Sequence, residues 1–154
     1  MSIHWTERFW AKVDQTGDCW LWTAGKDSSG YGSFRLGKMR PAHRVAYELA
    51  NGAITEGMEI DHICHVRACV RATHLREVTH KQNQENVLGA RRNSKSGVLG
   101  VLWVNQPKPW RAEVTHNTKL IHVGSFTSID EAKAAVIAKR NQLFTHNNLD
   151  RSIK

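Results

Sequence analysis

The sequence predicts an α+β protein, with a strand–loop–strand–helix core followed by a small three-stranded antiparallel sheet and one helix. Two periodicities predict this class, because apolar residues alternate in short segments and recur three or four apart in longer ones. A third observation concerns residues 64–74, which show no apolar period. An irregular loop of about ten residues normally requires something other than a core to hold it.

Size and composition exclude several classes of protein. At 154 residues, the chain corresponds to one ordinary domain or two small ones. It has no run of 18 apolar residues and no secretory signal at its start, so we expect no membrane contact and a cytoplasmic location. Three cysteines are an odd number, which disfavours a disulfide framework and favours metal binding in a reducing compartment.

The positive charge is concentrated in the second part of the chain. Residues 1–90 contain 11 Lys and Arg against 10 Asp and Glu, whereas residues 91–154 contain 11 against 4. The total is +8. Such asymmetry favours a polyanion-binding surface in the second part, with a merely soluble basic domain as the alternative.

The first third is expected to provide packing elements. Helical spacing in residues 1–17 predicts a short helix. Residues 18–22 and 31–36 read as strands, and the glycines and serines between them predict an antiparallel pair across a loop. Residues 42–49 predict a helix that Gly52 ends.

The central third predicts the core. Residues 58–63 and 76–78 read as strands on either side of the irregular loop. Thr79 is placed to cap a helix over residues 80–88, with Gln82 at the third helical position, as in a capping box. The predicted order is therefore strand, loop, strand, helix.

The last third changes character. Residues 98–104, 110–115 and 119–126 predict three strands joined by turns, and a helix that Ser128 or Asp130 caps follows them. Four parts are predicted: a first domain that contains the core (residues 1–90), a basic linker (91–97), a small sheet domain (98–145) and a flexible tail (146–154).

The irregular loop carries candidate zinc ligands. Cys64, Cys69 and His74 are soft or borderline donors at intervals of five residues. A structural zinc site needs a fourth ligand, and Cys19 is the one remaining cysteine. His65 is the competing candidate, although its place directly after Cys64 would strain a tetrahedron. We expect a structural Zn²⁺ here, and reduced, unliganded thiols are the alternative.

Three further residues suggest hydrolytic chemistry. Asp61 and Asn83 offer the hard oxygens that Mg²⁺ prefers, and His62 lies beside the acid. Phosphodiester hydrolysis needs a water, a base and a cation on the scissile phosphate. His62 can be the base if a carbonyl or carboxylate oxygen holds its other ring nitrogen. We therefore expect His62 as the general base and a catalytic Mg²⁺ bound by Asp61 and Asn83.

This stretch resembles the ββα-metal (His-Me finger) nucleases of the HNH group, notably phage and intron-encoded HNH homing endonucleases and the His-Cys box endonucleases. The residues that carry the resemblance are Asp61-His62, Cys64, Cys69, His74-Leu75, Val78-Thr79 and Asn83. The resemblance implies the same roles for His62, Asp61 and Asn83. It also implies a structural zinc whose fourth ligand is an earlier cysteine, which supports Cys19.

Two departures from the family pattern stand out. Arg71-Ala72 occupies the position where many relatives have Asn-Pro, which makes the loop less rigid. His74 replaces the middle asparagine that gives the motif its name, and this exchange fits zinc ligation.

The last third resembles the plant ethylene-response-factor (Apetala-two) DNA-binding domain. Residues 96–101, 110–112, 121–126 and 130–132 carry this resemblance. It implies a three-stranded sheet in the major groove, where basic and aromatic side chains reach phosphates and base edges. The candidate DNA-binding residues of the linker and sheet are Arg91, Arg92, Lys95, Trp103, Trp110, Arg111 and Lys119. For Trp103, packing against the helix is the alternative.

Together these features predict an HNH homing-type DNA endonuclease that acts on double-stranded DNA, in the host cytoplasm if a phage encodes it. The sequence has no clear dimerisation signal, which favours a monomer over a dimer. One alternative is a zinc-stabilised DNA-binding regulator without nuclease activity, and another is a basic zinc protein that binds RNA. The set of Asp61, His62 and Asn83 favours the enzyme, because neither alternative uses all three.

Overall fold

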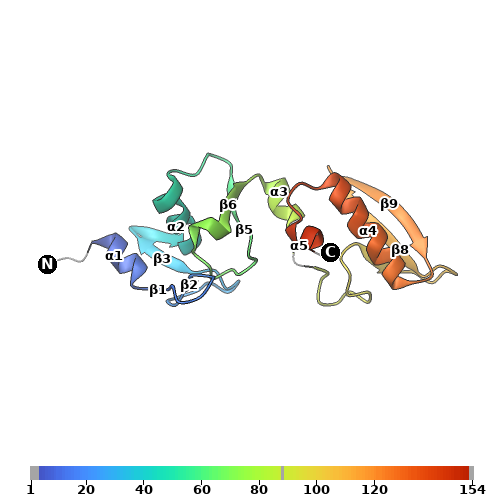
Figure 1. Ribbon diagram of the computed structural model, residues 1–154, viewed down its shortest axis with the longest axis horizontal. Helices are drawn as coiled ribbons and strands as arrows, with labels where there is room; N and C mark the ends of the chain where they lie inside the picture. Colours follow the sequence, from blue (N-terminus) through green and yellow to red (C-terminus); the bar gives the residue numbers. More distant parts are fainter. Residues whose placement is uncertain (1–3, 88, 153–154) are drawn as a thin grey trace. The chain divides into compact units, whose positions relative to one another are not determined.

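The computed structural model describes residues 4–87 and 89–152, and the chain divides into two compact units (Figure 1). These units comprise residues 1–83 and 84–154. Residues 84–97, which the sequence assigns to the end of the first domain and to a linker, group with the second unit. None of the helices in the described part of the chain has the length and apolarity that a membrane crossing requires.

The first unit is built from short helices and two-stranded antiparallel sheets, β1 with β2, β3 with β4 and β5 with β6. Its elements are α1 (Trp5–Trp10), β1 (Val13–Asp14), β2 (Leu21–Trp22), β3 (Ser33–Leu36), β4 (Lys38–Pro41), α2 (Ala42–Asn51), β5 (Glu59–His62), the 3₁₀ turn η1 (Ala72–His74) and β6 (Leu75–Val78). Helix α3 (His80–Glu85) follows and crosses the boundary between the two units.

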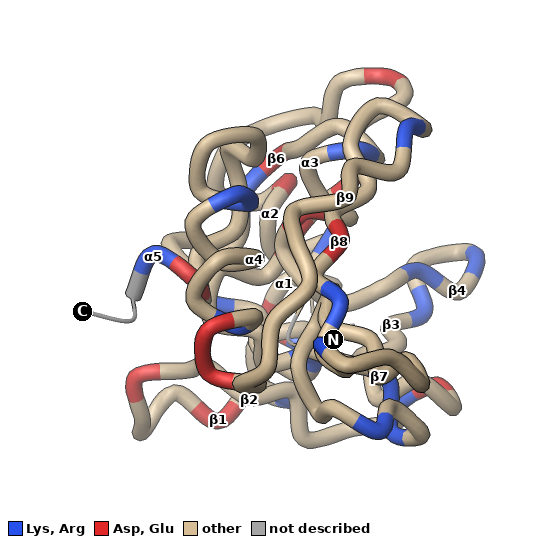
Figure 2. Tube along the Cα trace, turned by 90° about the vertical axis from the view of Figure 1, so that its right-hand side faces the viewer, with Lys and Arg blue, Asp and Glu red and all other residues tan. Residues whose placement is uncertain are grey.

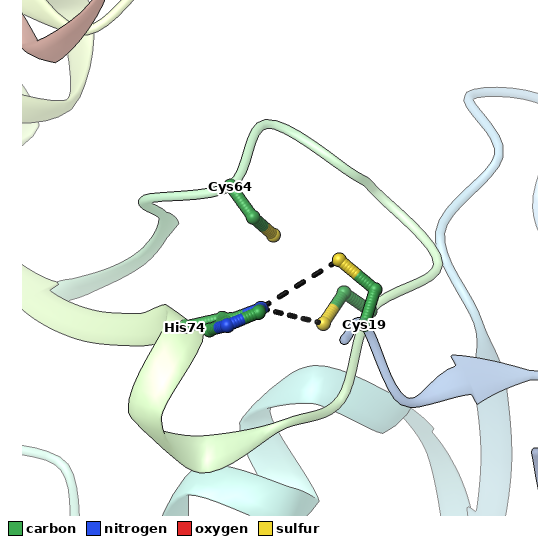
Figure 3. A group of neighbouring side chains, drawn as sticks. Cys19, Cys64 and His74 are labelled. Carbon is green, nitrogen blue, oxygen red and sulfur yellow. Dashed lines mark hydrogen bonds between the residues drawn. The ribbon is translucent and has the colours of Figure 1, made fainter. Parts of the chain in front are cut away.

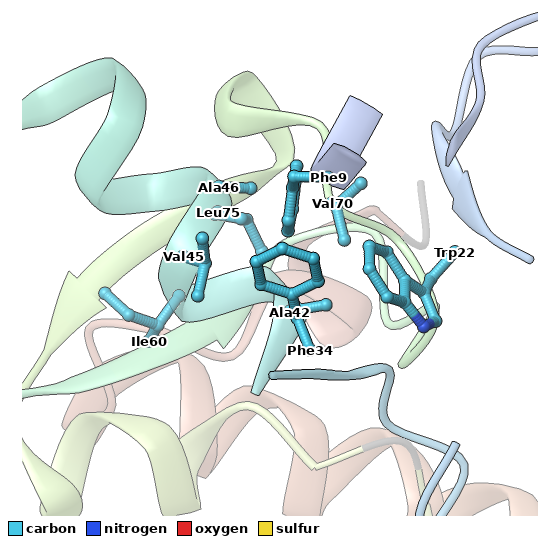
Figure 4. Packing of buried hydrophobic residues seen from close by; sticks show 9 residues of the cluster. All are labelled: Phe9, Trp22, Phe34, Ala42, Val45, Ala46, Ile60, Val70 and Leu75. Carbon is cyan, nitrogen blue, oxygen red and sulfur yellow. The ribbon is translucent and has the colours of Figure 1, made fainter. Parts of the chain in front are cut away.

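One aromatic cluster organises the core of the first unit. Phe9, Trp22 and Phe34 are almost fully buried, and their ring centroids lie between 5.1 and 5.8 Å apart. Aliphatic residues of α2, β5, β6 and the loop complete the cluster (Figure 4). They are Ala42, Val45, Ala46, Ile60, Val70 and Leu75. The core therefore ties the N-terminal segment to the irregular loop.

The first strand pairing differs from the prediction. Residues 18–22 and 31–36 do not form a hairpin, because β2 pairs with β1, and β3 turns back onto β4 at Gly37 (φ +69°). The indole of Trp22 packs so closely on Gly32 that a Cβ there would lie 2.6 Å from the ring. The two segments are therefore neighbours through side-chain packing, and only a glycine allows this approach.

The predicted strand–loop–strand–helix order is present. Strand β5 pairs antiparallel with β6, and helix α3 follows directly. The backbone N–H of Thr79 donates to Gln82 Oε1 (2.8 Å), and the N–H of Gln82 donates to Thr79 Oγ1 (3.3 Å). These reciprocal bonds confirm the predicted capping box. The helix ends at Glu85, before Leu88, the predicted end, which lies outside the described residues.

The second unit has a simpler plan. Strands β7 (Val101–Trp103), β8 (Trp110–His116) and β9 (Lys119–Phe126) form an antiparallel sheet in the order β7-β8-β9. Helix α4 (Ile129–Leu143) packs on the sheet, and Ser128 caps it by accepting a bond from the N–H of Asp130. The shared core consists of Val101, Ala112, Val114, Ala132 and Val136.

The segment predicted as a flexible tail contains structure. Helix α5 (Asn148–Ser152) lies in it, and its Asp150 binds Arg140 of α4. The guanidinium donates from Nε to Oδ2 (2.6 Å) and from Nη2 to Oδ1 (2.8 Å). Arg140 is buried, and a buried charge needs a partner, so an ion pair that periodicity does not reveal joins α5 to α4.

Candidate metal centre and active site

Cys19, Cys64, Cys69 and His74 converge on one point. Their ligand atoms all lie within 4.8 Å of one another. The Nδ1 atom of His74 is 3.6 Å from the sulfur of Cys19 and 3.7 Å from that of Cys69. Figure 3 shows Cys19, Cys64 and His74 pointing toward one another from separate segments. The structure thus brings together the four residues expected to bind zinc.

Backbone hydrogen bonds bring these segments together. The N–H of Trp22 donates to the carbonyl of Ala68, and the N–H of Val70 donates to that of Trp20, both at 2.8 Å. The loop is thereby joined to the strand that follows Cys19. His65, the competing fourth ligand, does not belong to the group, and it occupies a left-handed conformation (φ +58°). A turn at His65 directs the chain from Cys64 back toward the cluster.

The chemistry of the cluster fits a soft cation. Burial and the neighbouring thiols of Cys64 and Cys69 raise the pKa of Cys19 to about 12. Burial also raises the pKa of Cys69, so the thiols of Cys19 and Cys69 would stay protonated at neutral pH without a cation, whereas a bound metal stabilises thiolates. A carboxylate oxygen of Asp18 lies 3.7 Å from Nε2 of His74, in the position of the acid that commonly supports a metal-binding histidine. Three thiolates and one imidazole are a ligand set typical of structural zinc.

His62 lies at the end of β5 and is buried, with 6% of its surface exposed. Its Nε2 is 3.0 Å from the carbonyl oxygen of Cys69. Because a carbonyl oxygen only accepts, this contact requires the proton on Nε2 and leaves a lone pair on Nδ1. Burial lowers the pKa of His62, although the bond to the Cys69 carbonyl acts in the opposite direction. The ring is therefore a neutral imidazole, the form that can accept a proton.

The structure gives Asp61 and Asn83 different partners. The carboxylate of Asp61 is buried and accepts from Arg76, the residue opposite it on β6, at 2.8 to 2.9 Å. The amide Nδ2 of Asn83 donates to Oε2 of Glu59 (2.5 Å). No contact between the predicted pair is present among the described residues, although Glu59 and Asp61 lie two apart on one face of β5.

Glu59 is a residue that the sequence reasoning missed. Its second oxygen lies 2.8 Å from Nδ1 of His80, so that one carboxylate holds two residues of α3. These bonds from Asn83 and His80 lower the pKa of Glu59. Strand alternation offered a signal, because it places Glu59 on the same face as Asp61.

A cavity of about 230 Å³ lies beside these residues. Its polar lining includes Asp27, Tyr31, His43, Arg44, Glu59 and Asn83. The ring of His62 adjoins this lining, with its centroid 4.8 Å from that of His43 and 5.7 Å from that of Tyr31. The candidate metal ligand Asn83 therefore lines the cavity, and the candidate base His62 packs against two residues of its lining.

The candidate DNA-binding residues of the second unit occupy different environments. Arg91, Arg92 and Lys119 are exposed, whereas Trp110 is half-buried against the core. The Nζ atom of Lys95 lies 4.9 Å from the ring centroid of Trp103, which is 45% exposed. Arg111 forms an ion pair of 2.7 Å with Glu113, which reduces its availability to a phosphate.

A family model and a phage protein each match part of this chain. The chain is 37% identical over 83 residues to Protein 7.7 of Escherichia phage T7, an alignment that covers 53% of this chain and 64% of that protein. The chain thus spans just under two thirds of its relative. No solved structure matches, and neither match supports the Apetala-two resemblance of the last third. The family model described as "HNH endonuclease" matches residues 40–85, the stretch that carries His62, Asn83 and most of the cysteine–histidine cluster.

Proposed function

We propose that the protein is a metal-dependent endonuclease that hydrolyses phosphodiester bonds of double-stranded DNA, with His62 as the general base. The observation that carries this proposal is the contact between Nε2 of His62 and the carbonyl of Cys69. It orients the ring and assigns its tautomer, so that Nδ1 is ready to take a proton from water. The HNH endonuclease match over residues 40–85 supports a nuclease.

The catalytic metal would be held on the side of β5 and α3. A carboxylate can only accept hydrogen bonds, so the amide nitrogen of Asn83 faces Glu59. The amide oxygen Oδ1 of Asn83 therefore faces away from Glu59, and this oxygen would bind Mg²⁺. Asp61 would supply the carboxylate, steadied by Arg76. A bound Mg²⁺ would stabilise negative charge on the scissile phosphate and on the leaving oxygen. Glu59 then acts as the positioning residue for Asn83.

The cysteine–histidine cluster would hold a structural Zn²⁺. Cys69 contributes its thiol to the cluster and its carbonyl to His62. A metal that immobilises Cys69 therefore also holds the base, which makes the structural site part of the support of the active site.

The second unit would bind the DNA duplex. The net charge of +7 that residues 91–154 carry supports this role. Exposed Arg91, Arg92 and Lys95 would contact phosphates, with Trp103 beside them. A recognition unit next to a nuclease unit is the arrangement that a homing-type enzyme needs, and a monomer of this kind would nick one strand.

The second candidate is a zinc-stabilised DNA-binding regulator without nuclease activity. The 6% exposure of His62 favours this candidate, because a base must meet its water. Both candidates bind DNA, so cleavage alone separates them.

The decisive experiment incubates zinc-loaded protein with supercoiled plasmid, with and without Mg²⁺, and scores nicked and linear products. We expect Mg²⁺-dependent cleavage that His62→Ala reduces by at least about 100-fold, the usual range for a general base. DNA affinity and zinc content should stay near those of the wild type, because the substitution removes neither a phosphate contact nor a thiol.

His4→Ala is the matched control, since it removes an exposed imidazole far along the chain from the site. It should cut at the wild-type rate. A wild-type protein that binds DNA and zinc but leaves the plasmid intact with Mg²⁺ would favour the regulator. Undiminished cleavage by the His62 variant would exclude His62 as the base.

A further inference from the structure

His43 is a buried histidine with unused hydrogen-bonding capacity. It is the second residue of α2, and 9% of its surface is exposed. Its Nδ1 is buried without a partner, and its side chain makes no hydrogen bond to any described residue. Unpaired polar atoms in the interior are costly and usually reflect a function or a ligand. Its position in the lining of the 230 Å³ cavity, against the ring of His62, points to a ligand.

Arg44, the next residue, lines the same cavity. Its side chain has no hydrogen-bond or ion-pair partner within the described part of the chain. Both residues lie in the first turn of α2, which contains no acidic residue and has no side-chain cap. The N–H of Ala42 donates to the carbonyl of Gly32 (2.8 Å), but the helix dipole still favours an anion at such an end. The histidine, the arginine and the helix end therefore offer donors to one place.

The lining of the cavity also contains two carboxylates, Asp27 and Glu59, and both accept hydrogen bonds. Asp27 accepts from the N–H groups of Ser29 and Tyr31 at 2.9 and 3.0 Å. Glu59 accepts from α3, as described above. Burial and the neighbouring His62 and Arg44 lower the pKa of His43 to about 3, so this ring is neutral at pH 7. The charged groups of the lining are thus one guanidinium and two carboxylates. A divalent cation together with one phosphodiester would bring their sum to neutrality.

We propose that this cavity binds one phosphodiester group of the nucleic-acid backbone, with Arg44 and an N–H of His43 on its non-bridging oxygens. The inference rests on the proposed function, because it places the phosphate between these donors and the proposed metal ligand Asn83, which lines the same cavity. Arg44 supplies the charge and the bidentate geometry. His43 supplies a neutral donor directly beside the base.

The test compares Arg44→Gln, Arg44→Lys and His43→Gln with the wild type, and Lys133→Gln on α4 controls for the loss of one exposed positive charge. In single-turnover plasmid cleavage with Mg²⁺, Arg44→Gln should cut about 100-fold more slowly, as when one donor to a developing charge is removed. Arg44→Lys should recover part of the rate. His43→Gln should lower the rate constant more than it weakens binding. Lys133→Gln should match the wild type.

Two readouts are independent of cleavage. In Ca²⁺, which supports binding without hydrolysis, the affinity of Arg44→Gln for a double-stranded oligonucleotide should depend less steeply on salt, by about one counterion. Because Arg44 forms no hydrogen bond or ion pair with any described residue, the melting temperature of Arg44→Gln should stay close to that of the wild type. Loss of the salt-dependent contact at an unchanged melting temperature supports the phosphate site.

The failures can be told apart. A wild type that does not cut contradicts the proposed function, and the oligonucleotide experiment still tests the cavity. A wild type that cuts, with an Arg44→Gln variant that cuts and binds equally well, overturns the phosphate site. A lowered melting temperature with a parallel loss of rate and binding would assign Arg44 a structural role, which also overturns it.

Discussion

The two units of this protein are stabilised by different means. The second unit has a three-stranded sheet covered by the 15-residue helix α4, with a continuous aliphatic core. The first unit has only two-stranded sheets, which are marginal in isolation. Its aromatic core holds one side, and the loop between β5 and β6 depends on the cysteine–histidine cluster. The unit that carries the candidate chemistry is therefore the one in which a bound metal would add most to stability.

The distribution of charge differs as well. The second unit carries most of the net positive charge, whereas in the first unit Lys and Arg gather along the β3–β4 hairpin (Figure 2). Arg8, Lys12 and Arg35 line a cavity of about 300 Å³ beside that hairpin. A near-zero sum over the first part of the sequence thus conceals a local cationic surface. Net charge per domain is a poor guide to where individual charges lie.

The largest expected effect comes from removing the proposed zinc. A strong chelator, or Cys69→Ser, should unfold the loop of the first unit, because binding of a structural zinc contributes about 10 kcal/mol to the folding of such sites. Hydrogen exchange should become fast at the amides of Trp22 and Val70, which bind the loop. The amides between β8 and β9 should stay protected. Metal analysis that finds no bound metal in the wild type, or slow exchange at Val70 after chelation, would contradict the site.

A smaller effect is expected from Asp150→Asn in the second unit. It removes the partner of Arg140, whose side chain is 7% exposed, and breaking a buried ion pair costs about 3 kcal/mol. Zinc content should not change. Glu48→Gln is the matched control, because the Arg40–Glu48 pair is 28% exposed on both sides and should contribute less than about 1 kcal/mol. If urea denaturation showed that both variants lose the same free energy of unfolding, burial would not distinguish the two ion pairs.

Local patterns predicted most of the elements. The capping box at Thr79 and Gln82, the order of the central core and the three-stranded sheet follow from periodicity and turn residues, which act over a few positions. The convergence of Cys19 with the loop could be predicted because few residue types bind zinc, and the chain has only three cysteines.

Contacts between residues that are distant in the sequence could not be predicted from local patterns. The partner of a short strand depends on packing, as with Trp22 on Gly32, and not on its own residues. The pairing of Asn83 with Glu59 joins residues 24 positions apart, and the ordering of α5 depends on one arginine of α4. The helical pattern of residues 42–49 left solvent, an ion pair and a phosphate open as the surroundings of Arg44, and only the fold places His43 and Arg44 in the cavity beside His62.

The smallest expected effect comes from removing Lys95, whose ammonium group lies over the ring of Trp103. This change tests whether the second unit contacts DNA through Lys95. An exposed cation–π contact is worth about 0.5 kcal/mol, so Lys95→Ala should barely change stability. If Lys95 also binds a phosphate, the salt dependence of DNA binding should fall by about one counterion, and Trp103 fluorescence should respond to DNA.

Lys108→Ala removes an exposed lysine of the turn between β7 and β8 and serves as the control. A specific contact predicts that the Lys95 variant loses more affinity than the Lys108 variant. If the two variants lost equal affinity, the second unit would attract DNA by its net charge alone. The sheet would then contribute affinity without a fixed position on the DNA. Sequence recognition would in that case have to come from the first unit, where the β3–β4 hairpin carries its own cations.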